Sequence, residues 1–176
     1  MAEISVILVS TGENSYLGQA VRMLQIFGKV EILEILVVLP FGHYAIRKQL
    51  EQKQKIRLLE KDWSGLAAAY NFGAAAATGR ILLFLHDDIV FAPNTLRLLE
   101  GVLRQGERIG AVGPFLNRTL YHEQYMEAAE YDRVEDLRLF ASSVEQSSSS
   151  QEVPFLENPC LLVRREAYEE VDGFSE

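Results

Sequence analysis

The sequence is poor in cysteine, in positive charge and in long apolar runs, and each shortage excludes a class of protein. Its single cysteine, Cys160, rules out an internal disulfide framework and is compatible with a reducing compartment. With 17 basic against 25 acidic residues the net charge is −8 and there is no basic run, so we expect no nucleic-acid partner. An anionic small ligand would need a local cation, such as a metal ion, to offset this acidic background.

Two absences bear on location. No stretch reaches the roughly 18 uninterrupted apolar residues that indicate a membrane span. The opening residues, "MAEISVILVS", lack the basic start and the small-residue cleavage site of a signal peptide. We therefore expect a cytoplasmic chain without a membrane span.

Short apolar runs alternate with helical periodicities over the first two thirds of the chain. Four runs predict buried strands, at residues 4–10, 35–39, 55–60 and 81–86. Helices are expected after each run: from an N-cap at Ser15, over residues 44–54, over residues 65–78 with Gly79 as C-terminal cap, and from Pro93 with Leu96, Leu99, Val102 and Leu103 as its buried face. The alternation predicts an α/β fold, a Rossmann-like, doubly wound and mostly parallel sheet with helices on both faces.

The last third has a weaker pattern. Short strands are expected within residues 109–116 and at residues 161–163, the second followed by a helix over residues 165–171. The serine-rich residues 142–150 are polar and of low complexity, which predicts a mobile loop. No internal repeat is apparent, and we expect one domain over residues 1–176.

Two adjacent carboxylates stand where the fourth apolar run ends, in "ILLFLHDD". Ligands of open α/β sheets bind outside the carboxyl ends of the strands, where His86, Asp87, Asp88, Ser10 and Thr11 would all lie. Side chains two apart on an extended segment point the same way, so we expect His86 and Asp88 to converge while Asp87 points elsewhere. An imidazole and a carboxylate can hold Mg²⁺ or Mn²⁺ that also takes phosphate oxygens and water. The alternative is that these are solvated loop acids capping the next helix.

Three blocks of sequence resemble glycosyltransferase family 2, the nucleotide-sugar transferases of the GT-A fold. They are "ISVILVSTGENSYLGQAVRML", "GLAAAYNFGAAAATGRILLFLHDD" and "CLLVRREAYEEVDGFSE", which look like the family's opening strand and helix, its central Asp-x-Asp signature and the segment after its acceptor region. The blocks come in the family's order and cover nearly the whole chain. The resemblance implies a nucleotide-sugar-binding half over residues 1–116 and an acceptor-side portion over residues 117–176.

The resemblance also implies roles for the residues at the strand ends. Asp88 matches the second acid of Asp-x-Asp, the metal ligand, and His86 stands at the first-acid position. Asp87 is the variable middle residue, which can approach the donor ribose or sugar. Ser10 and Thr11 lie where the donor base and ribose would pack.

The chain departs from the family at two further points. Asn71 matches the signature of the alanine-rich helix and is a candidate donor contact, but Tyr70 replaces the arginine often found before that asparagine. Leu39 and Pro40 stand where the family usually has Asp-Asp-Gly-Ser with an acid that recognises the base. Backbone groups would then have to hold the base.

The implied activity is an inverting, metal-dependent transfer from a nucleoside-diphosphate sugar, a UDP-sugar or another, to a hydroxyl of a carbohydrate or other acceptor. The family's catalytic base follows its Gly-Phe-Asp-Glu segment, so the resemblance places the base beyond Glu176 and implies a longer protein. One alternative is a non-catalytic nucleotide-sugar-binding module. Another is a nucleotidyltransferase, although "STGENSYLG" lacks the lysine expected in that class.

Some remaining side chains have competing interpretations. Arg164 and Arg165 could offset diphosphate charge or could begin a solvated helix. Trp63 could stack on a ligand, but a half-buried packing role is favoured, and His43 is expected at the surface.

Overall fold

The structure is a computed structural model of the 176-residue chain. It describes residues 3–12, 16–27, 32–51, 53, 55–92, 94–117, 119–126, 133, 136–137, 139–140 and 150–176. The positions of Ser15, Pro93 and residues 142–149, on which an N-cap, a helix start and most of a mobile loop are predicted, lie outside the described residues.

Strands and helices alternate along the chain as predicted. The strands are β1 (Ile4–Val9), β2 (Ile32–Leu39), β3 (Ile56–Glu60), β4 (Ile81–His86), β5 (Ala111–Val112) and β6 (Cys160–Arg164). The helices are α1 (Leu17–Phe27), α2 (Tyr44–Leu50), α3 (Leu66–Ala76), α4 (Thr95–Leu103), the 3₁₀ turn η1 (His122–Gln124) and α6 (Arg165–Glu170). None of the helices in the described part of the chain has the length and apolar character needed to cross a membrane.

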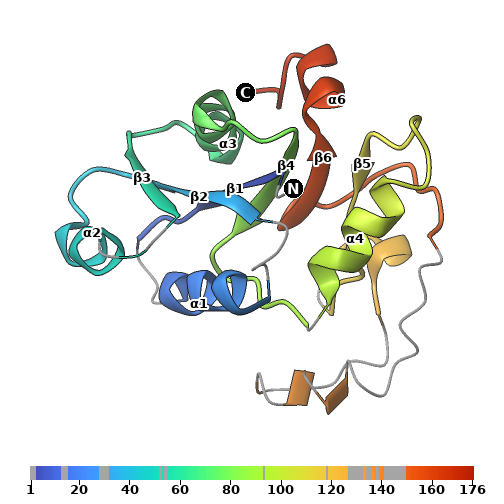
Figure 1. The fold of residues 1–176 in the computed structure, drawn as a ribbon, viewed down its shortest axis with the longest axis horizontal. Coiled ribbons are helices and arrows are strands. Elements are labelled where there is room, and N and C mark those ends of the chain that lie inside the picture. The colour runs from blue at the N-terminus through green and yellow to red at the C-terminus, as the bar shows by residue number, and fades with distance from the viewer. Residues whose placement is uncertain are drawn as a thin grey trace.

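The strands form one sheet in the order β3-β2-β1-β4-β6-β5 (Figure 1). The pairs β2–β3, β1–β2 and β1–β4 are parallel, whereas β6 runs antiparallel to both β4 and β5. The mostly parallel α/β sheet is thus confirmed. Its β6, although it comes last in the chain, lies beside β4 inside the sheet, so both halves of the sequence build one structure.

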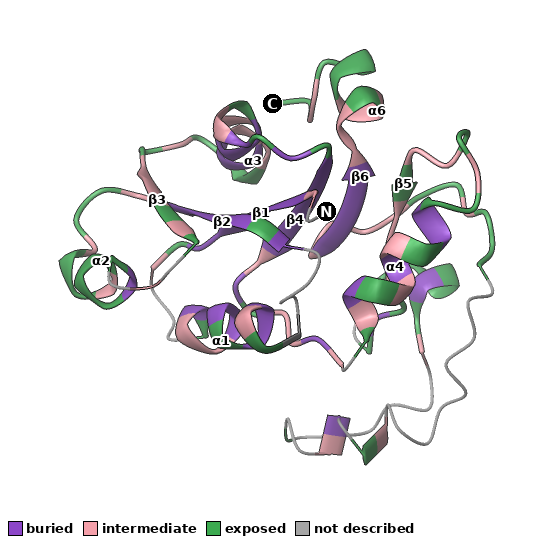
Figure 2. Cartoon of the chain, in the orientation of Figure 1, coloured by how far each residue is buried: buried purple, intermediate pink, exposed green. Residues whose placement is uncertain are grey.

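Helices cover both faces of the sheet. Figure 1 shows α1, α2 and α4 on one face and α3 and α6 on the other. Two core clusters match these layers, because alternate residues of β1 point to opposite faces: Ile4, Val6 and Leu8 pack with α1 and α4, and Ile7 and Val9 pack with α3. The central strands are therefore buried on both sides (Figure 2).

Gly73 allows α3 to lie close to the sheet. A Cβ at this position would collide with Cγ2 of Ile7 and would lie 3.0 Å from Cγ2 of Val38, both on the central strands. Because those side chains belong to a close-packed core, they have little room to move. Gly73 therefore has a packing role.

We expect Gly73→Ala to lower the free energy of unfolding by about 1–3 kcal/mol, the usual cost of overpacking a core. Urea denaturation measures this change. Gly101→Ala in α4 is the matched control, since a Cβ there meets no atom within 4 Å, and alanine should be neutral or stabilising by up to about 1 kcal/mol. Equal stability of the parent and Gly73→Ala would contradict the packing role.

The predicted C-terminal cap at Gly79 is wrong. Helix α3 ends at Ala76, and its cap residue Ala77 is extended with φ −76° and ψ 150°. Gly79 is instead a point of close approach, because a Cβ there would lie 2.5 Å from the carbonyl oxygen of Glu3 and 2.7 Å from the backbone nitrogen of Ser5. The glycine lets the chain pass against β1 as it enters β4.

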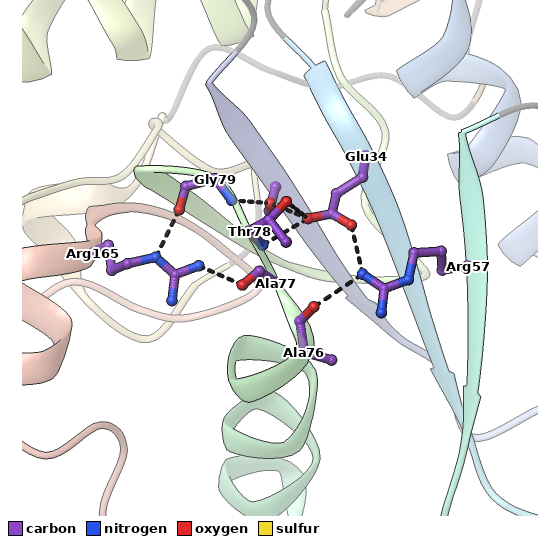
Figure 3. Close-up of polar contacts among 8 residues, drawn as sticks. Glu34, Arg57, Ala76, Ala77, Thr78, Gly79 and Arg165 are labelled. Atoms are coloured by element: carbon purple, nitrogen blue, oxygen red, sulfur yellow. Dashed lines mark hydrogen bonds and ion pairs between the residues drawn. The ribbon is translucent and has the colours of Figure 1, made fainter.

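A buried carboxylate, Glu34 on β2, organises the same end of the sheet (Figure 3). Its Oε1 accepts hydrogen bonds from the Ser5 hydroxyl at 2.8 Å and from the Thr78 backbone N–H and hydroxyl at 2.7 and 2.6 Å. Its Oε2 pairs with Arg57 at 2.8 Å. Burial opposes ionisation of Glu34, but the hydrogen bonds from Thr78, Ser5 and Arg57 outweigh it and lower the pKa to about 2. The carboxylate therefore ties β1, β2 and β3 to the α3–β4 turn.

Arg164 and Arg165 lie at this end too, so they do not offset diphosphate charge at the other edge of the sheet. The β4–β6 pairing places Arg164 opposite Ile81, at the far end of β4 from His86. Arg165 donates hydrogen bonds to the carbonyl oxygens of Gly79 at 2.7 Å and Ala77 at 2.9 Å. Arg165 thus holds the turn that enters β4, and Arg164 donates to the carbonyl oxygens of Leu103, Gly106 and Ile109 between α4 and β5.

Candidate functional site

The candidate site begins where β4 ends. The buried run of β4 stops at His86, and the chain then turns, with the Ile89 N–H donating to the His86 carbonyl oxygen at 3.3 Å. Burial differs sharply over this turn: the side chain of Asp87 is 7% exposed and that of Asp88 is 58% exposed. One carboxylate is thus enclosed by protein while its neighbour faces solvent.

The turn gathers His86, Asp87 and Asp88 into one cluster. Nδ1 of His86 lies 2.8 Å from Oδ1 of Asp88 and 3.2 Å from Oδ1 of Asp87, and the three residues offer ligand atoms within 4.8 Å of one another. The convergence of His86 and Asp88 is confirmed. The expectation that Asp87 points elsewhere is wrong, because the alternation of side chains in a strand ends with the strand.

Ser10 fixes the buried acid of the cluster. It follows β1, and Val9 of β1 pairs with His86 of β4, so Ser10 reaches the same edge of the sheet. The buried Ser10 hydroxyl donates a hydrogen bond to Oδ2 of Asp87 and accepts one from the Gly12 N–H at 3.1 Å. The Ser10 side chain therefore positions Asp87, whereas the neighbouring Thr11 is exposed and accessible to a ligand. Donor contacts of Ser10, Thr11 and Asp87 remain predictions.

The segments after β2 and β3 supply two further groups, His43 and Asp62, of which the sequence did not single out Asp62. Leu39 is buried and ends β2, and after Pro40 the Phe41 N–H donates to Oδ1 of Asp62 at 3.2 Å. The half-buried His43 ring packs against Gly12, so a Cβ on Gly12 would collide with it. Gly12 has φ +77°, which glycine adopts without strain. His43 thus shapes the loop after β1 rather than lying free at the surface.

Asn71 has a full set of partners in the C-terminal segment. Its Oδ1 accepts hydrogen bonds from the Tyr168 hydroxyl at 2.6 Å and the Phe174 N–H at 3.0 Å. Its Nδ2 donates to the Phe174 carbonyl at 2.9 Å and to Glu176 at 3.0 Å. The structure therefore shows Asn71 anchoring this segment to α3, and its predicted donor contact remains a prediction.

Cys160 and Trp63 have packing roles. Cys160 is fully buried, and burial raises the pKa of its thiol to about 12, so the thiol stays protonated and is a poor nucleophile near neutral pH. Trp63 is half-buried against the cluster on the α3 face, as favoured above.

A pocket of about 300 Å³ opens beside Asp88. Its walls come from the turn after β4 and from the segment after β5, and they are mostly apolar: Ile89, Val90, Phe91, Pro114, Phe115 and Leu116. Arg133 is the one basic residue among those that line it. Asp88 of the cluster thus lines a small pocket that is open to solvent on one side.

The cluster suits a divalent cation by its chemistry. One imidazole nitrogen and carboxylate oxygens form a donor set typical of Mn²⁺, and Mg²⁺ favours the oxygens alone. His86 and Asp88 are solvent-accessible, with side chains 29% and 58% exposed, so ligands from a substrate and from water could complete the coordination. The residues present therefore fit the metal that the sequence implied.

The chain matches the model of glycosyl transferase family 2 over residues 5–172. That range covers nearly the whole sequence, so the chain belongs to glycosyl transferase family 2. A comparison with curated protein sequences finds no match.

Solved structures with similar folds include glycosyltransferases. A mannosyltransferase from Pyrobaculum calidifontis, in complex with GDP-Man and Mn²⁺, has a TM-score of 0.68 at 22% identity, covering 98% of this chain and 47% of its own. Glucosyl-3-phosphoglycerate synthase from Mycobacterium tuberculosis, in complex with UDP, has a TM-score of 0.55 at 20% identity, covering 94% and 57%. GalNAc-T7 with UDP, GalNAc and Mn²⁺ has a TM-score of 0.56 at 20% identity, covering 64% and 22%. The chain thus shares the GT-A fold and spans about half the length of the first two proteins.

Proposed function

We propose that the chain forms the donor-binding part of a glycosyltransferase that moves a sugar from a nucleoside-diphosphate sugar to an acceptor hydroxyl. The observation that carries the proposal is the His86–Asp87–Asp88 cluster at the carboxyl end of β4, in a member of glycosyl transferase family 2. A ligand edge at that position is the general rule for open α/β sheets.

The residues at the carboxyl ends of β1, β2 and β4 would have different roles in donor binding. Asp88 and His86 would hold a divalent cation, and Ser10 fixes the buried Asp87 beside them. When bound, the metal supplies Lewis-acid stabilisation of the departing diphosphate, which a chain of net charge −8 otherwise disfavours. Thr11 and the loop after β2 would contact the nucleoside, with Leu39 and Pro40 leaving backbone groups to hold the base.

The acceptor would bind on the side formed by residues 117–176. The pocket beside Asp88 has walls from both portions of the chain, from the turn after β4 and from residues including Asn117, Arg133 and Leu137. An acceptor hydroxyl held there would lie next to the metal edge. Inversion at the anomeric carbon, with a carboxylate as general base, would complete the reaction.

A non-catalytic nucleotide-sugar-binding protein is the second candidate. It is favoured by His86 at the first-acid position and by the lack of an acid at Leu39 and Pro40. Transfer of a labelled sugar by the full-length protein would separate an enzyme from such a binding module.

Titration calorimetry tests the donor-binding proposal. UDP, GDP, UDP-glucose and GDP-mannose are titrated into the chain with Mn²⁺, and again with EDTA in place of the metal. At least one of the two nucleoside diphosphates, UDP or GDP, is expected to bind with Mn²⁺ and to lose most of its affinity with EDTA. Absence of binding across the panel with Mn²⁺ would refute the proposal.

His86 should give the site a preference for Mn²⁺ over Mg²⁺. Imidazole suits the transition metal better than the hard, strongly hydrated Mg²⁺, so we expect the bound nucleotide to show about tenfold higher affinity with Mn²⁺. His86→Asp should narrow this ratio by restoring oxygen donors, and His122→Asp, at an exposed histidine, should leave it unchanged. Equal affinity with the two metals in the parent chain would argue against a ligand role for His86.

A further inference from the structure

The pocket beside Asp88 has a buried apolar floor and a partly exposed rim. Phe91, Leu116 and Leu137 line it and are 5%, 8% and 9% exposed, whereas Phe115 is 53% exposed. Its volume of about 300 Å³ lies at the small end of the range for ligand pockets. The pocket therefore has room for one ring or a short chain rather than for an oligosaccharide.

Backbone hydrogen bonds fix the walls of this pocket. In the wall after β5, the Leu116 N–H donates to the Gln124 carbonyl oxygen at 2.7 Å, and the Leu116 carbonyl oxygen accepts from the Met126 N–H at 2.9 Å. In the wall after β4, the backbone N–H and the hydroxyl of Thr95 both donate to the Ala92 carbonyl oxygen, at 3.3 and 2.9 Å. Both walls are thus held in place without a ligand.

Polar side chains in the pocket are few. Among the described residues that line it, Asp88 is the only acid, Arg133 is the only base, and Thr95 and Asn117 are the only other polar residues. The Thr95 hydroxyl already donates to the backbone. A sugar ring carries several hydroxyls, and each one that leaves water for an apolar pocket needs a new hydrogen-bond partner. These walls offer too few partners for a sugar, so they favour an acceptor with an apolar skeleton.

Arg133 gives the pocket a positive charge. Its side chain is exposed, and no ion pair joins it to another residue in the described part of the chain. A guanidinium binds carboxylate and phosphate groups through parallel N–H donors. In a chain of net charge −8, a basic residue at an apolar pocket is therefore a specific attraction for an anionic ligand.

We propose that the acceptor has an apolar skeleton and an anionic group, a carboxylate or a phosphate, that pairs with Arg133. The skeleton would lie against Phe115 and the buried floor, with the acceptor hydroxyl toward Asp88 and the metal edge. As the hydroxyl oxygen bonds to the anomeric carbon, the bond from that carbon to the diphosphate breaks, the diphosphate leaves with the electron pair, and the hydroxyl proton passes to the general base. The inference rests on the proposed function and names the class of acceptor for it.

Saturation-transfer NMR with matched small probes tests the acceptor class. The probes are phloretate (a phenol with a carboxylate side chain), its uncharged methyl ester, para-hydroxybenzylphosphonate and methyl glucoside, each added to the chain with Mg²⁺ and the nucleoside diphosphate that binds best. At least one of the two anions should bind about three- to tenfold tighter than the ester, the gain from a charge-assisted hydrogen bond. Methyl glucoside should bind most weakly, and the two anions separate a carboxylate from a phosphate.

Two variants assign the binding to the pocket. Arg133→Gln should lower the affinity for the anion to that for the ester and leave the ester unaffected. Phe115→Ala should weaken the anion and the ester alike, by about fivefold, because both lose apolar contact. The matched controls, Arg108→Gln and Leu120→Ala, change an exposed arginine and an exposed leucine outside the pocket and should bind the probes as the parent does.

Replacing Mg²⁺ by the paramagnetic Mn²⁺ locates the bound probe. A Mn²⁺ ion held at Asp88 should broaden the ring protons of the bound anion, because Asp88 lines the same pocket. In Asp88→Ala the broadening should fall to that caused by free Mn²⁺ in solution. Binding of the anion without this broadening would place it away from the metal edge and overturn the proposal.

Three further results would overturn the acceptor class. The first is methyl glucoside binding as tightly as either anion. The second is an ester that binds as tightly as the anions, or an anion affinity that Arg133→Gln leaves unchanged. The third is a chain that binds a nucleotide but none of the probes. Each leaves the proposed function intact, whereas a chain that binds no nucleotide refutes the function itself.

Discussion

Replacing Asp88 by alanine is expected to weaken binding of a nucleoside diphosphate in the presence of Mn²⁺ by at least about 100-fold. Loss of a group that merely orients a metal ligand costs about 10–100-fold in metal affinity, and loss of the ligand itself should cost more. The fold should survive, because the Asp88 side chain is 58% exposed and its partner His86 is itself 29% exposed at the edge of the sheet. Calorimetry with UDP and GDP measures the loss.

The control for Asp88→Ala is Glu107→Ala, which removes an exposed acid outside the cluster. It should bind the nucleotide as the parent does, and both variants should unfold at the parent temperature within a few degrees. Parental affinity of Asp88→Ala with Mn²⁺ would show that the acid does not serve the metal. A large drop in its Tm would instead assign Asp88 to the fold.

Protonation or neutralisation of Glu34 is expected to remove about 3 kcal/mol from the free energy of unfolding. The folded-state pKa of Glu34 is lowered from 4.5 to about 2, so the folded protein gains stability from the ionised form. This contribution is fully present above pH 4.5 or so, and is lost as the pH falls toward 2. Glu34→Gln should therefore be destabilised at neutral pH and should approach the parent in acid.

Urea denaturation of the parent and Glu34→Gln over a pH series checks this dependence. Glu51→Gln is the matched control, since Glu51 forms an exposed pair with Arg47 whose loss should cost no more than about 0.5 kcal/mol. Glu34 lies at the opposite end of the sheet from His86, so nucleotide affinity of the folded variant should not change. Parallel pH profiles for the parent and Glu34→Gln would contradict the account of this carboxylate.

The fold could be predicted where the sequence signal is local. The apolar run of β4 was enough to predict that strand, and the helical spacing of Leu96, Leu99, Val102 and Leu103 was enough to predict α4 and its buried face. All four of these side chains are buried. The direction of β6 could not be predicted, because a short apolar run is the same in parallel and antiparallel sheets. Gly79 was assigned to a cap because the sequence does not show that this point of the chain touches Glu3 and Ser5.

The site was predictable to the extent that it lies on one strand end. His86 and Asp88 converge as expected because they frame a single turn, whereas the position of Asp87 depends on Ser10, 77 residues earlier. The approach of the segment before β6 to this turn could not be predicted, because it depends on the antiparallel pairing of β6 with β4.

Diffraction at the manganese absorption edge, on crystals grown with Mn²⁺ and the nucleoside diphosphate that binds best, tests the central claim most directly. That claim is that His86 and Asp88 hold a divalent cation at the carboxyl end of β4. We expect one strong anomalous peak in contact with an oxygen of Asp88 and with the diphosphate, and its loss in Asp88→Ala. A nucleotide bound with its metal away from β4, or bound with no metal at all, would contradict the claim.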